Sequence, residues 1–257
     1  MATQRPEIDL RGKTALVTGA SRGIGLAIAR VLARCGADVI GIGTAISRNA
    51  QELARDFEGL AGRFTPMDCD LSDRDAIDRL LAALDADAAP IDILVNNAGI
   101  IRREEAATHS TQDWDAVMAV NLDAVFLLSR ALGAKMLARG HGKIINTASV
   151  LSFQGGILVP GYAAAKGAVA QLTHALANEW AASGVNVNAV APGYVATDVT
   201  SALQQDAQRT AALMARVPAG RWGEPEEIAW PVAFLASDMA DFIHGAILPV
   251  DGGWLSR

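Results

Sequence analysis

The chain has 257 residues, of which 51% are hydrophobic and 19% are charged, and its formal net charge is −6 at pH 7. A chain of this length and hydropathy buries enough apolar surface for a full core, which excludes disorder as its dominant state. The acidic balance argues against nucleic-acid binding, because that function needs a basic face to displace counterions. The two cysteines, Cys35 and Cys69, are too few for a disulfide framework and are expected to be free buried thiols.

Neither a secretory signal nor a membrane span is expected. The first seven residues, MATQRPE, lack the apolar stretch of a signal peptide. The long uncharged stretch between Lys143 and Lys166 contains Asn146, Gln154, Gly155, Gly156 and Pro160, so it is not expected to cross a membrane. The histidines have no metal-ligand spacing. We therefore predict a cytoplasmic protein with a small-molecule substrate, no nucleic-acid or membrane partner, and no metal.

Apolar runs of strand length alternate with amphipathic segments of helix length. The predicted strands are 14–18, 39–42, 63–67, 91–95, 143–148, 185–191 and 247–250. The predicted helices are 23–35, 72–84, 111–138, 162–182 and one that opens at Pro225. This alternation is typical of α/β proteins in which helices cover both faces of a parallel sheet.

No repeat, low-complexity tract or linker interrupts the pattern, so one domain over residues 1–257 is preferred to two. The fold class is α/β, with a doubly wound seven-stranded parallel sheet. Between residues 197 and 222 the pattern weakens. A segment after the sixth strand of such a fold lies beside the carboxyl ends of the strands, where ligands bind. We interpret 197–222 as a substrate lid.

A glycine-rich turn, TGASRGIG at residues 18–25, joins the first predicted strand to the first helix. Glycines at 19, 23 and 25 permit a tight turn, close approach of a pyrophosphate and close packing of the helix on the strand. The helix N-terminus adds free N–H groups for phosphate. The alternative is an ordinary glycine-rich turn, but the order of strand, turn and helix favours dinucleotide binding.

Further motifs follow in an order that resembles the short-chain dehydrogenases/reductases along almost the whole chain. They are Asn96-Asn-Ala-Gly99, Asn121, Ser149, Tyr162-Ala-Ala-Ala-Lys166, Pro192-Gly193 and Thr197. The resemblance implies a single Rossmann-like domain, usually in a homotetramer. It also implies hydride transfer between a nicotinamide and a carbonyl or alcohol.

The resemblance implies four catalytic residues: Asn121, Ser149, Tyr162 and Lys166. Lys166 lies four residues after Tyr162, and an ammonium about 4 Å away could lower the tyrosine pKa by about three units. Tyr162 is then the general acid/base, and Ser149 stabilises the substrate oxygen. The family role of Asn121 is to hold a water that links Lys166 to solvent. Each residue alone has an ordinary structural explanation, and only their joint occurrence favours catalysis.

The cofactor contacts carry over by position from the same family. Gly43 stands where NAD-preferring proteins commonly have a carboxylate, so NAD(H) or NADP(H) is expected and NADP(H) should be accepted. Arg22, Thr44 and Arg48 are candidate partners of a 2′-phosphate, although both arginines could instead be solvated surface residues. The expected cofactor-binding residues are Gly19, Ser21, Arg22, Gly23, Ile24, Gly25, Thr44, Asp70, Leu71, Asn97, Ala98, Gly99, Tyr162, Lys166, Pro192, Gly193, Val195 and Thr197.

Segments that flank the predicted site resemble the bacterial 2-dehydro-3-deoxy-D-gluconate 5-dehydrogenases, also named 2-deoxy-D-gluconate 3-dehydrogenases. These segments are 91–103, 151–157, 178–180, 218–223 and 250–257. Residues 42–49 and 21–23 are more similar to the 3-oxoacyl carrier-protein reductases. A deoxy sugar acid is therefore the first candidate substrate and a 3-oxoacyl thioester the alternative. A dinucleotide-sensing protein without chemistry is disfavoured by the intact catalytic set.

A sugar acid needs a cation in its pocket, and a guanidinium binds a carboxylate through two hydrogen bonds. Arg103 is our first choice, with Gln154, Arg221 and Trp222 in loops expected to close over the nicotinamide. The alternative is that Arg103 and its neighbour Arg102 form surface ion pairs with the two glutamates that follow them.

Overall fold

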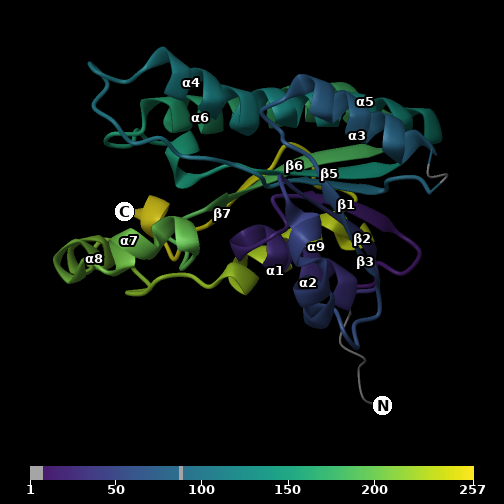
Figure 1. Ribbon diagram of the computed structural model, residues 1–257, viewed down its shortest axis with the longest axis horizontal. Coiled ribbons are helices and arrows are strands. Elements are labelled where there is room, and N and C mark those ends of the chain that lie inside the picture. Colours follow the sequence, from purple (N-terminus) through teal and green to yellow (C-terminus); the bar gives the residue numbers. More distant parts are fainter. Residues whose placement is uncertain (1–7, 87–88) are drawn as a thin grey trace.

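A computed structural model describes residues 8–86 and 89–257 (Figure 1). The strands in these ranges form one sheet in the order β3-β2-β1-β4-β5-β6-β7, and every pairing is parallel. They are β1 (Thr14–Thr18), β2 (Asp38–Gly43), β3 (Phe64–Asp68), β4 (Ile93–Asn96), β5 (Gly142–Thr147), β6 (Val185–Pro192) and β7 (Ile247–Val250). The predicted fold class is confirmed. The strand order reverses between β1 and β4, where such a sheet opens a ligand crevice.

Helices cover both faces of the sheet (Figure 1). On one side lie α1 (Gly23–Arg34), α2 (Ala50–Asp56) and α9 (Pro225–Ala236). On the other lie α3 (Arg74–Ala86), α4 (Thr111–Met118), α5 (Ala124–Arg139) and α6 (Pro160–Trp180). The two cores divide the strand residues by alternation: Ala15 and Val17 of β1 face the α1 side, whereas Leu16 belongs to the other core.

Several elements differ from the sequence prediction, among them the short helices α7 (Ser201–Gln204) and α8 (Ala207–Met214). Helix α2 and the short turn before it were not predicted, because only Ile46 and Leu53 of this stretch are buried and the apolar periodicity is too sparse to detect. The predicted helix over 111–138 is interrupted by a π-helical turn, Ala119–Asp123, that carries Asn121. A π turn inside a helix commonly marks a functional position.

The α4–α5 segment, Thr111–Arg139, is the one helical stretch among the described residues that is long and apolar enough to cross a membrane. Its place in the fold is different, because α5 packs against α3, α6 and β5. Leu128, Leu132 and Met136 are buried in this packing. It is therefore a helix of the core.

Both cysteines are free thiols, but only Cys69 is buried, and Cys35 is half-buried because it ends α1. Burial raises the pKa of both thiols, to about 11 for Cys69. Both thiols are therefore protonated at neutral pH and weak nucleophiles.

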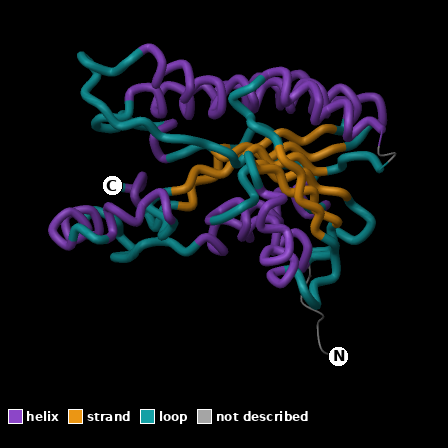
Figure 2. Tube along the Cα trace, in the orientation of Figure 1, coloured by secondary structure: helices purple, strands orange, loops and turns teal. Residues whose placement is uncertain are grey.

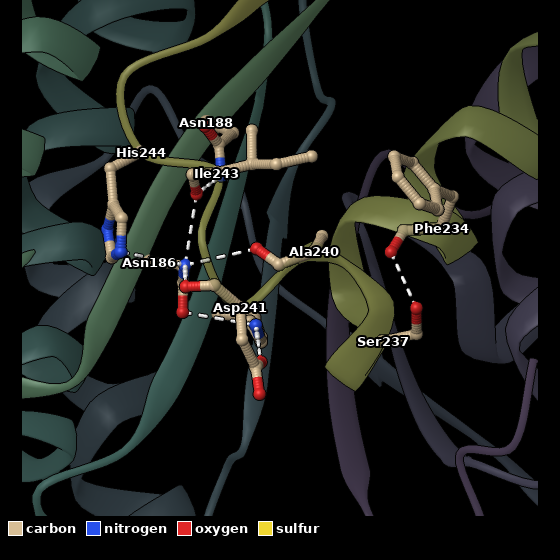
Figure 3. A network of polar contacts seen from close by, with 9 residues as sticks. Asn186, Asn188, Phe234, Ser237, Ala240, Asp241, Ile243 and His244 are labelled. Carbon is tan, nitrogen blue, oxygen red and sulfur yellow. Dashed lines mark hydrogen bonds and ion pairs between the residues drawn. The ribbon is translucent and has the colours of Figure 1, made fainter.

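The polar network in Figure 3 fixes the last strand of the sheet. Asn186 donates its side-chain N–H groups to the carbonyl oxygens of Asp241 and Ile243, each at 3.0 Å. Asn188 donates to the same Ile243 oxygen at 2.8 Å and accepts the Ala246 N–H at 2.9 Å. These buried amides hold the loop before β7 and so determine where the C-terminal segment leaves the sheet.

That segment runs to the carboxyl edge of the sheet and ends near residues 197–222 (Figures 1 and 2). Residues 197–222 contain two short helices, α7 (Ser201–Gln204) and α8 (Ala207–Met214). They lie beside the carboxyl ends of the strands, where the sequence pattern placed them.

Candidate active site

A cavity of about 1000 Å³ opens at the carboxyl edge of the sheet. Its lining comes from the turn after β1, the loops after the other central strands, the first turns of α6 and the α7–α8 segment. It includes every residue that the sequence predicted to bind the cofactor. Ser149, Tyr162 and Lys166 also line it, and Asn121 lies outside the lining.

The turn after β1 has no room for side chains at two of its glycines. A Cβ atom at Gly25 would lie 2.1 Å from the carbonyl oxygen of Gly19. Gly19 has a φ of +68°, and a Cβ atom there would lie 3.0 Å from the Cα of Ala98. No side chain in the described part of the chain caps α1, so its first N–H groups face the cavity unshielded. This cradle fits a dinucleotide pyrophosphate.

Thr18 and Asn97 lock the turn after β1 to the turn after β4. The Thr18 hydroxyl accepts hydrogen bonds from the backbone N–H groups of Asn97 and Ala98, at 2.9 and 3.0 Å. The Asn97 amide donates to the Thr18 carbonyl oxygen at 3.0 Å. Sequence analysis gave Thr18 no role of its own. The available signal was a threonine as the last residue of the strand that enters the glycine-rich turn.

Helix α6 carries Tyr162 and Lys166 one turn apart. Lys166 is only 3% exposed, and its Nζ donates to the carbonyl oxygen of Thr147 at 2.5 Å. The same nitrogen lies 5.6 Å from the centre of the Tyr162 ring. Burial lowers the pKa of Lys166 to about 8, because an ammonium loses its hydration in the core.

The pKa of Tyr162 is raised, and burial is the largest cause. A hydrogen bond with the Ser149 hydroxyl and the charge of Arg103 act in the opposite direction. The expected lowering of this pKa by Lys166 is therefore wrong. The ammonium is held by the Thr147 carbonyl, and the loss of hydration of the phenolate outweighs the favourable charges.

Ser149 and α6 are joined by a second serine that sequence analysis missed. The Ser149 hydroxyl accepts the Leu151 N–H at 3.1 Å. Ser152 accepts the Ser149 N–H at 3.3 Å and donates to the Lys166 carbonyl oxygen at 2.6 Å. Ser152 therefore fixes the loop after β5 to the turn of α6 that bears Lys166.

The Asn121 side chain is fully buried and pairs with the backbone of Ile100. Its Oδ1 accepts the Ile100 N–H at 2.8 Å, and its Nδ2 donates to the Ile100 carbonyl at 2.9 Å. A Cβ atom at Gly99 would lie 3.2 Å from Asn121 Oδ1 and 3.9 Å from Lys166 Nζ, so both groups approach the same glycine. Asn121 braces the turn after β4, and its water-holding role stays a prediction.

Arg103 and Gln154 line the cavity. Among the described residues, Arg103 has no side-chain hydrogen bond or ion pair, whereas Arg102 pairs with Asp113 at 3.2 Å. The expected alternative, ion pairs with the following glutamates, is therefore not formed. Arg103 is left available to a ligand.

The structure does not bring Arg221 and Trp222 into the lining. Arg221 forms two hydrogen bonds with the Glu227 carboxylate, at 2.6 and 2.7 Å. The Trp222 ring packs edge-on against Tyr194, with ring centres 5.9 Å apart. In their place the cavity is lined by Tyr194, Arg209, Leu213, Arg216 and Trp254, none of which the sequence motifs singled out.

At the adenosine end, Gly43 packs close to Ser21, since a Cβ atom at Gly43 would lie 3.7 Å from Ser21 Oγ. Arg22 lies 3.6 Å from the Asp198 carboxylate, and both side chains are 70% exposed. Thr44 lines the cavity, whereas Arg48 does not.

The sequence profile of a family described as "Enoyl-(Acyl carrier protein) reductase" matches residues 19–255. A 2-dehydro-3-deoxy-D-gluconate 5-dehydrogenase of Pseudoalteromonas atlantica is 53% identical over 98% of this chain and 99% of that one. The chain belongs to the short-chain dehydrogenase/reductase family. It is an NAD(P)-dependent oxidoreductase that acts on a CH–OH group, as the sequence resemblance predicted.

Two other members of the family are similar to this one. A solved structure from Agrobacterium tumefaciens, provisionally described as a 2-deoxy-D-gluconate 3-dehydrogenase with bound NADP, is 50% identical with a TM-score of 0.88. The alignment covers 98% of this chain and 100% of the Agrobacterium chain. A 3-oxoacyl-(acyl-carrier-protein) reductase of Vibrio cholerae is 46% identical over 96% of this chain and 98% of its own.

Proposed function

We propose that the protein transfers a hydride between NADP(H) or NAD(H) and a deoxy sugar acid of the 2-dehydro-3-deoxy-D-gluconate or 2-deoxy-D-gluconate type. The observation that carries the proposal is Arg103, a guanidinium without a protein partner in the described chain, in the same cavity as Tyr162. The similarity to a sugar-acid dehydrogenase over nearly the full length supports it.

The cofactor's nicotinamide would supply or accept the hydride. The glycine cradle at Gly19 and Gly25 would hold the pyrophosphate, and Lys166 the nicotinamide ribose. Tyr162 donates its proton to the substrate oxygen as the ketone becomes an alcohol, and accepts it in the reverse reaction. Ser149 hydrogen-bonds the same oxygen and stabilises its developing charge.

The raised pKa of Tyr162 keeps the phenol protonated at neutral pH, which suits it to donate a proton to a forming alkoxide. In the oxidative direction the phenol must first lose that proton. The positive charge of Arg103 favours the phenolate, and so does the hydrogen bond with Ser149. Oxidation is therefore expected to increase with pH, whereas reduction is not.

Arg103 would bind the substrate carboxylate. We expect Arg103→Ala to cost about 1–3 kcal/mol in kcat/KM for 2-deoxy-D-gluconate, because a charge-assisted pair is lost at an exposed arginine where solvent screens part of the attraction. The amide of the same acid carries no charge and should lose little. Equal losses on the acid and the amide would remove Arg103 from the substrate site.

NADP(H) is the preferred cofactor in this proposal. No carboxylate stands at Gly43 to repel a 2′-phosphate, and Arg22 is exposed beside the glycine cradle. The NADP-bound relative supports this preference. Steady-state kinetics with NADH and NADPH at saturating substrate test it, and absence of NADPH turnover would contradict it.

The alternative, reduction of a 3-oxoacyl thioester, has support in the similarity to the Vibrio protein. It requires an apolar channel, whereas the cavity lining includes Arg103, Arg209 and Arg216. A panel of ketoaldonates and acetoacetyl thioesters separates the two. Turnover of the thioesters alone would favour the alternative.

The 197–222 segment is proposed as a lid, and the protein as a cytoplasmic homotetramer. Large apolar side chains on the surface support subunit interfaces, because such groups rarely stay exposed in a monomer. They include Trp114, Phe126, Trp230 and Phe242. Sedimentation equilibrium at several protein concentrations tests the assembly, and a monomer at micromolar concentration would refute it.

A further inference from the structure

A second guanidinium without a carboxylate partner lies on the lid. Arg216 follows α8 and lines the cavity, and in the described chain it has no ion pair. Its guanidinium carbon lies 4.1 Å from the centre of the Trp254 ring, and Trp254 lines the same cavity. A guanidinium stacked on indole keeps its outer edge available for a planar anion.

Trp254 is a rigid support for this contact. It is 6% exposed and packs in a small core with Val150 and Val217. Its ring meets Tyr194 edge-on, with centres 4.9 Å apart. The Asp251 carboxylate accepts N–H groups of Gly253 and Leu255 at 2.8 and 3.0 Å, which fixes the turn that carries the indole.

The indole N–H of Trp254 is buried and has no partner among the described residues. Within the described chain, the contacts of the indole are therefore packing contacts of its ring. Its ring face is the part that meets Arg216. This separates the stacking role of the residue from a polar role, and it makes phenylalanine a conservative replacement.

The C-terminal segment also ties down the end of the lid that bears Arg216. Ala219 donates its N–H to the Gly252 carbonyl at 3.0 Å, and Arg257 donates to the Ala215 carbonyl at 2.9 Å. A Cβ atom at Gly252 would lie 2.9 Å from Val217, so the two segments are in close contact. Arg216 is thus held between two anchored positions.

Arg103 and Arg216 reach the cavity from different sides. Arg103 lies in the loop between β4 and α4, and Arg216 follows α8; α4 and α8 lie on opposite sides of the sheet in Figure 1. The charge of Arg103 stabilises the Tyr162 phenolate, so this arginine lies near the reacting centre. Arg216 enters the cavity from another segment, the one that follows α8.

We propose that Arg216, held on Trp254, binds the carboxylate of sugar acids that react at a carbon remote from it, and so determines which carbon reaches Tyr162. Carbon 5 of a hexonate lies farther along the chain from the carboxylate than carbon 3 does. Binding of the carboxylate by Arg216 places carbon 5 at Tyr162, and binding by Arg103 places carbon 3 there. The inference rests on the proposed function. It divides the sugar-acid substrates into those that react at carbon 5 and those that react at carbon 3.

The first test measures kcat/KM for 2-dehydro-3-deoxy-D-gluconate and for its amide. Arg216→Ala should lose about 10- to 100-fold on the acid and less than about threefold on the amide. Arg216→Lys should fall between, because it keeps the charge without the planar stack. Arg55→Ala is the matched control, since Arg55 is an exposed arginine of α2 that lies outside the cavity lining.

Trp254 is tested as a positioning residue. Trp254→Phe should retain most activity, whereas Trp254→Leu should show the acid-specific loss of Arg216→Ala. The double variant should lose no more on the acid than either single variant, because both remove one interaction. If Trp254 only maintains the fold, its variants will lose activity equally on the acid and the amide.

The second test uses D-gluconate, which carries hydroxyl groups at both carbon 3 and carbon 5. NMR of the products should show mainly the 5-ketone for the wild type, and a shift toward the 3-ketone for Arg216→Ala. An unchanged product ratio together with equal losses on acid and amide would overturn the assignment of Arg216. Wild-type turnover of thioesters but of no sugar acid would instead overturn the proposed function.

Discussion

Replacing Lys166 with methionine tests the energetic consequence of burying its ammonium. Burial lowers the pKa of this group from 10.5 to about 8. Because the folded state holds the proton more weakly than the unfolded state, the unfolded state binds more protons between these pH values, and stability rises with pH there. The penalty is fully present below about pH 8 and is gone above about pH 10.5. A methionine has no such penalty.

The magnitude follows from the pKa difference. At about 1.4 kcal/mol per pH unit, it is about 3 kcal/mol at pH 7 and falls below about 1 kcal/mol at pH 10. Methionine also loses the hydrogen bond to Thr147, which destabilises the variant by about 1–3 kcal/mol at every pH. The free energy of unfolding of the wild type should therefore rise by about 2–3 kcal/mol relative to Lys166→Met between pH 7 and pH 10.

The assay is urea unfolding of both cofactor-free proteins at pH 7, 8.5 and 10. Protein concentration is held constant, because subunit association contributes to apparent stability. Other tyrosines and lysines titrate over this range, and subtracting the variant cancels their contribution. Stability curves that run parallel with pH would refute the reasoning. Turnover should be lost in the variant at every pH.

Three further substitutions address the cavity. Tyr162→Phe should reduce kcat by more than about 10²-fold while leaving cofactor affinity nearly unchanged, because it removes the proton donor and little binding surface. Fluorescence titration with NADPH measures the cofactor affinity. A variant that keeps a tenth of the wild-type kcat would contradict the assignment of Tyr162. Thr18→Val should lower the free energy of unfolding by about 1–3 kcal/mol, since it leaves two partly buried N–H groups without their hydroxyl acceptor. The exposed Thr65→Val is its control in the same urea experiment. Gly43→Asp should raise KM for NADPH much more than for NADH, and equal effects on both cofactors would contradict our interpretation of this turn.

The architecture could be predicted because the strands carry a clear signal. Strand β1 has the predicted bounds, and the strand–helix alternation fixed the all-parallel sheet. Helix α2 was missed because its apolar positions are sparse. The π turn was missed because an inserted residue leaves no mark on a long apolar pattern. The unfavourable position of Asn121 inside a helix was its one visible sign.

The candidate site likewise has residues that the sequence predicted and residues that it missed. Residues of the cofactor cradle could be predicted because the tight turn itself requires glycines at fixed spacing, and this requirement is visible in the local sequence. Thr18, Ser152 and Trp254 were missed because their roles depend on partners far away in the sequence. Arg221 illustrates the converse. Its position at the end of the lid suggested a substrate contact, but the carboxylate of Glu227, six residues later, accepts hydrogen bonds from both of its terminal nitrogens.

The π turn at Ala119–Asp123 also determines how the protein responds to the deletion of a single codon. Each residue of an α-helix turns the chain by about 100°, so an extra residue here sets the rotational phase between α4 and α5. In α4, Trp114 and Val117 face Gly161, the residue before Tyr162, while α5 faces the sheet. Loss of a single codon from this turn would join the two helices in one phase and swing Val117 away from Gly161. An in-frame deletion of one residue here should therefore inactivate the protein, and it would also displace Ala116 and Val120, which line the cavity.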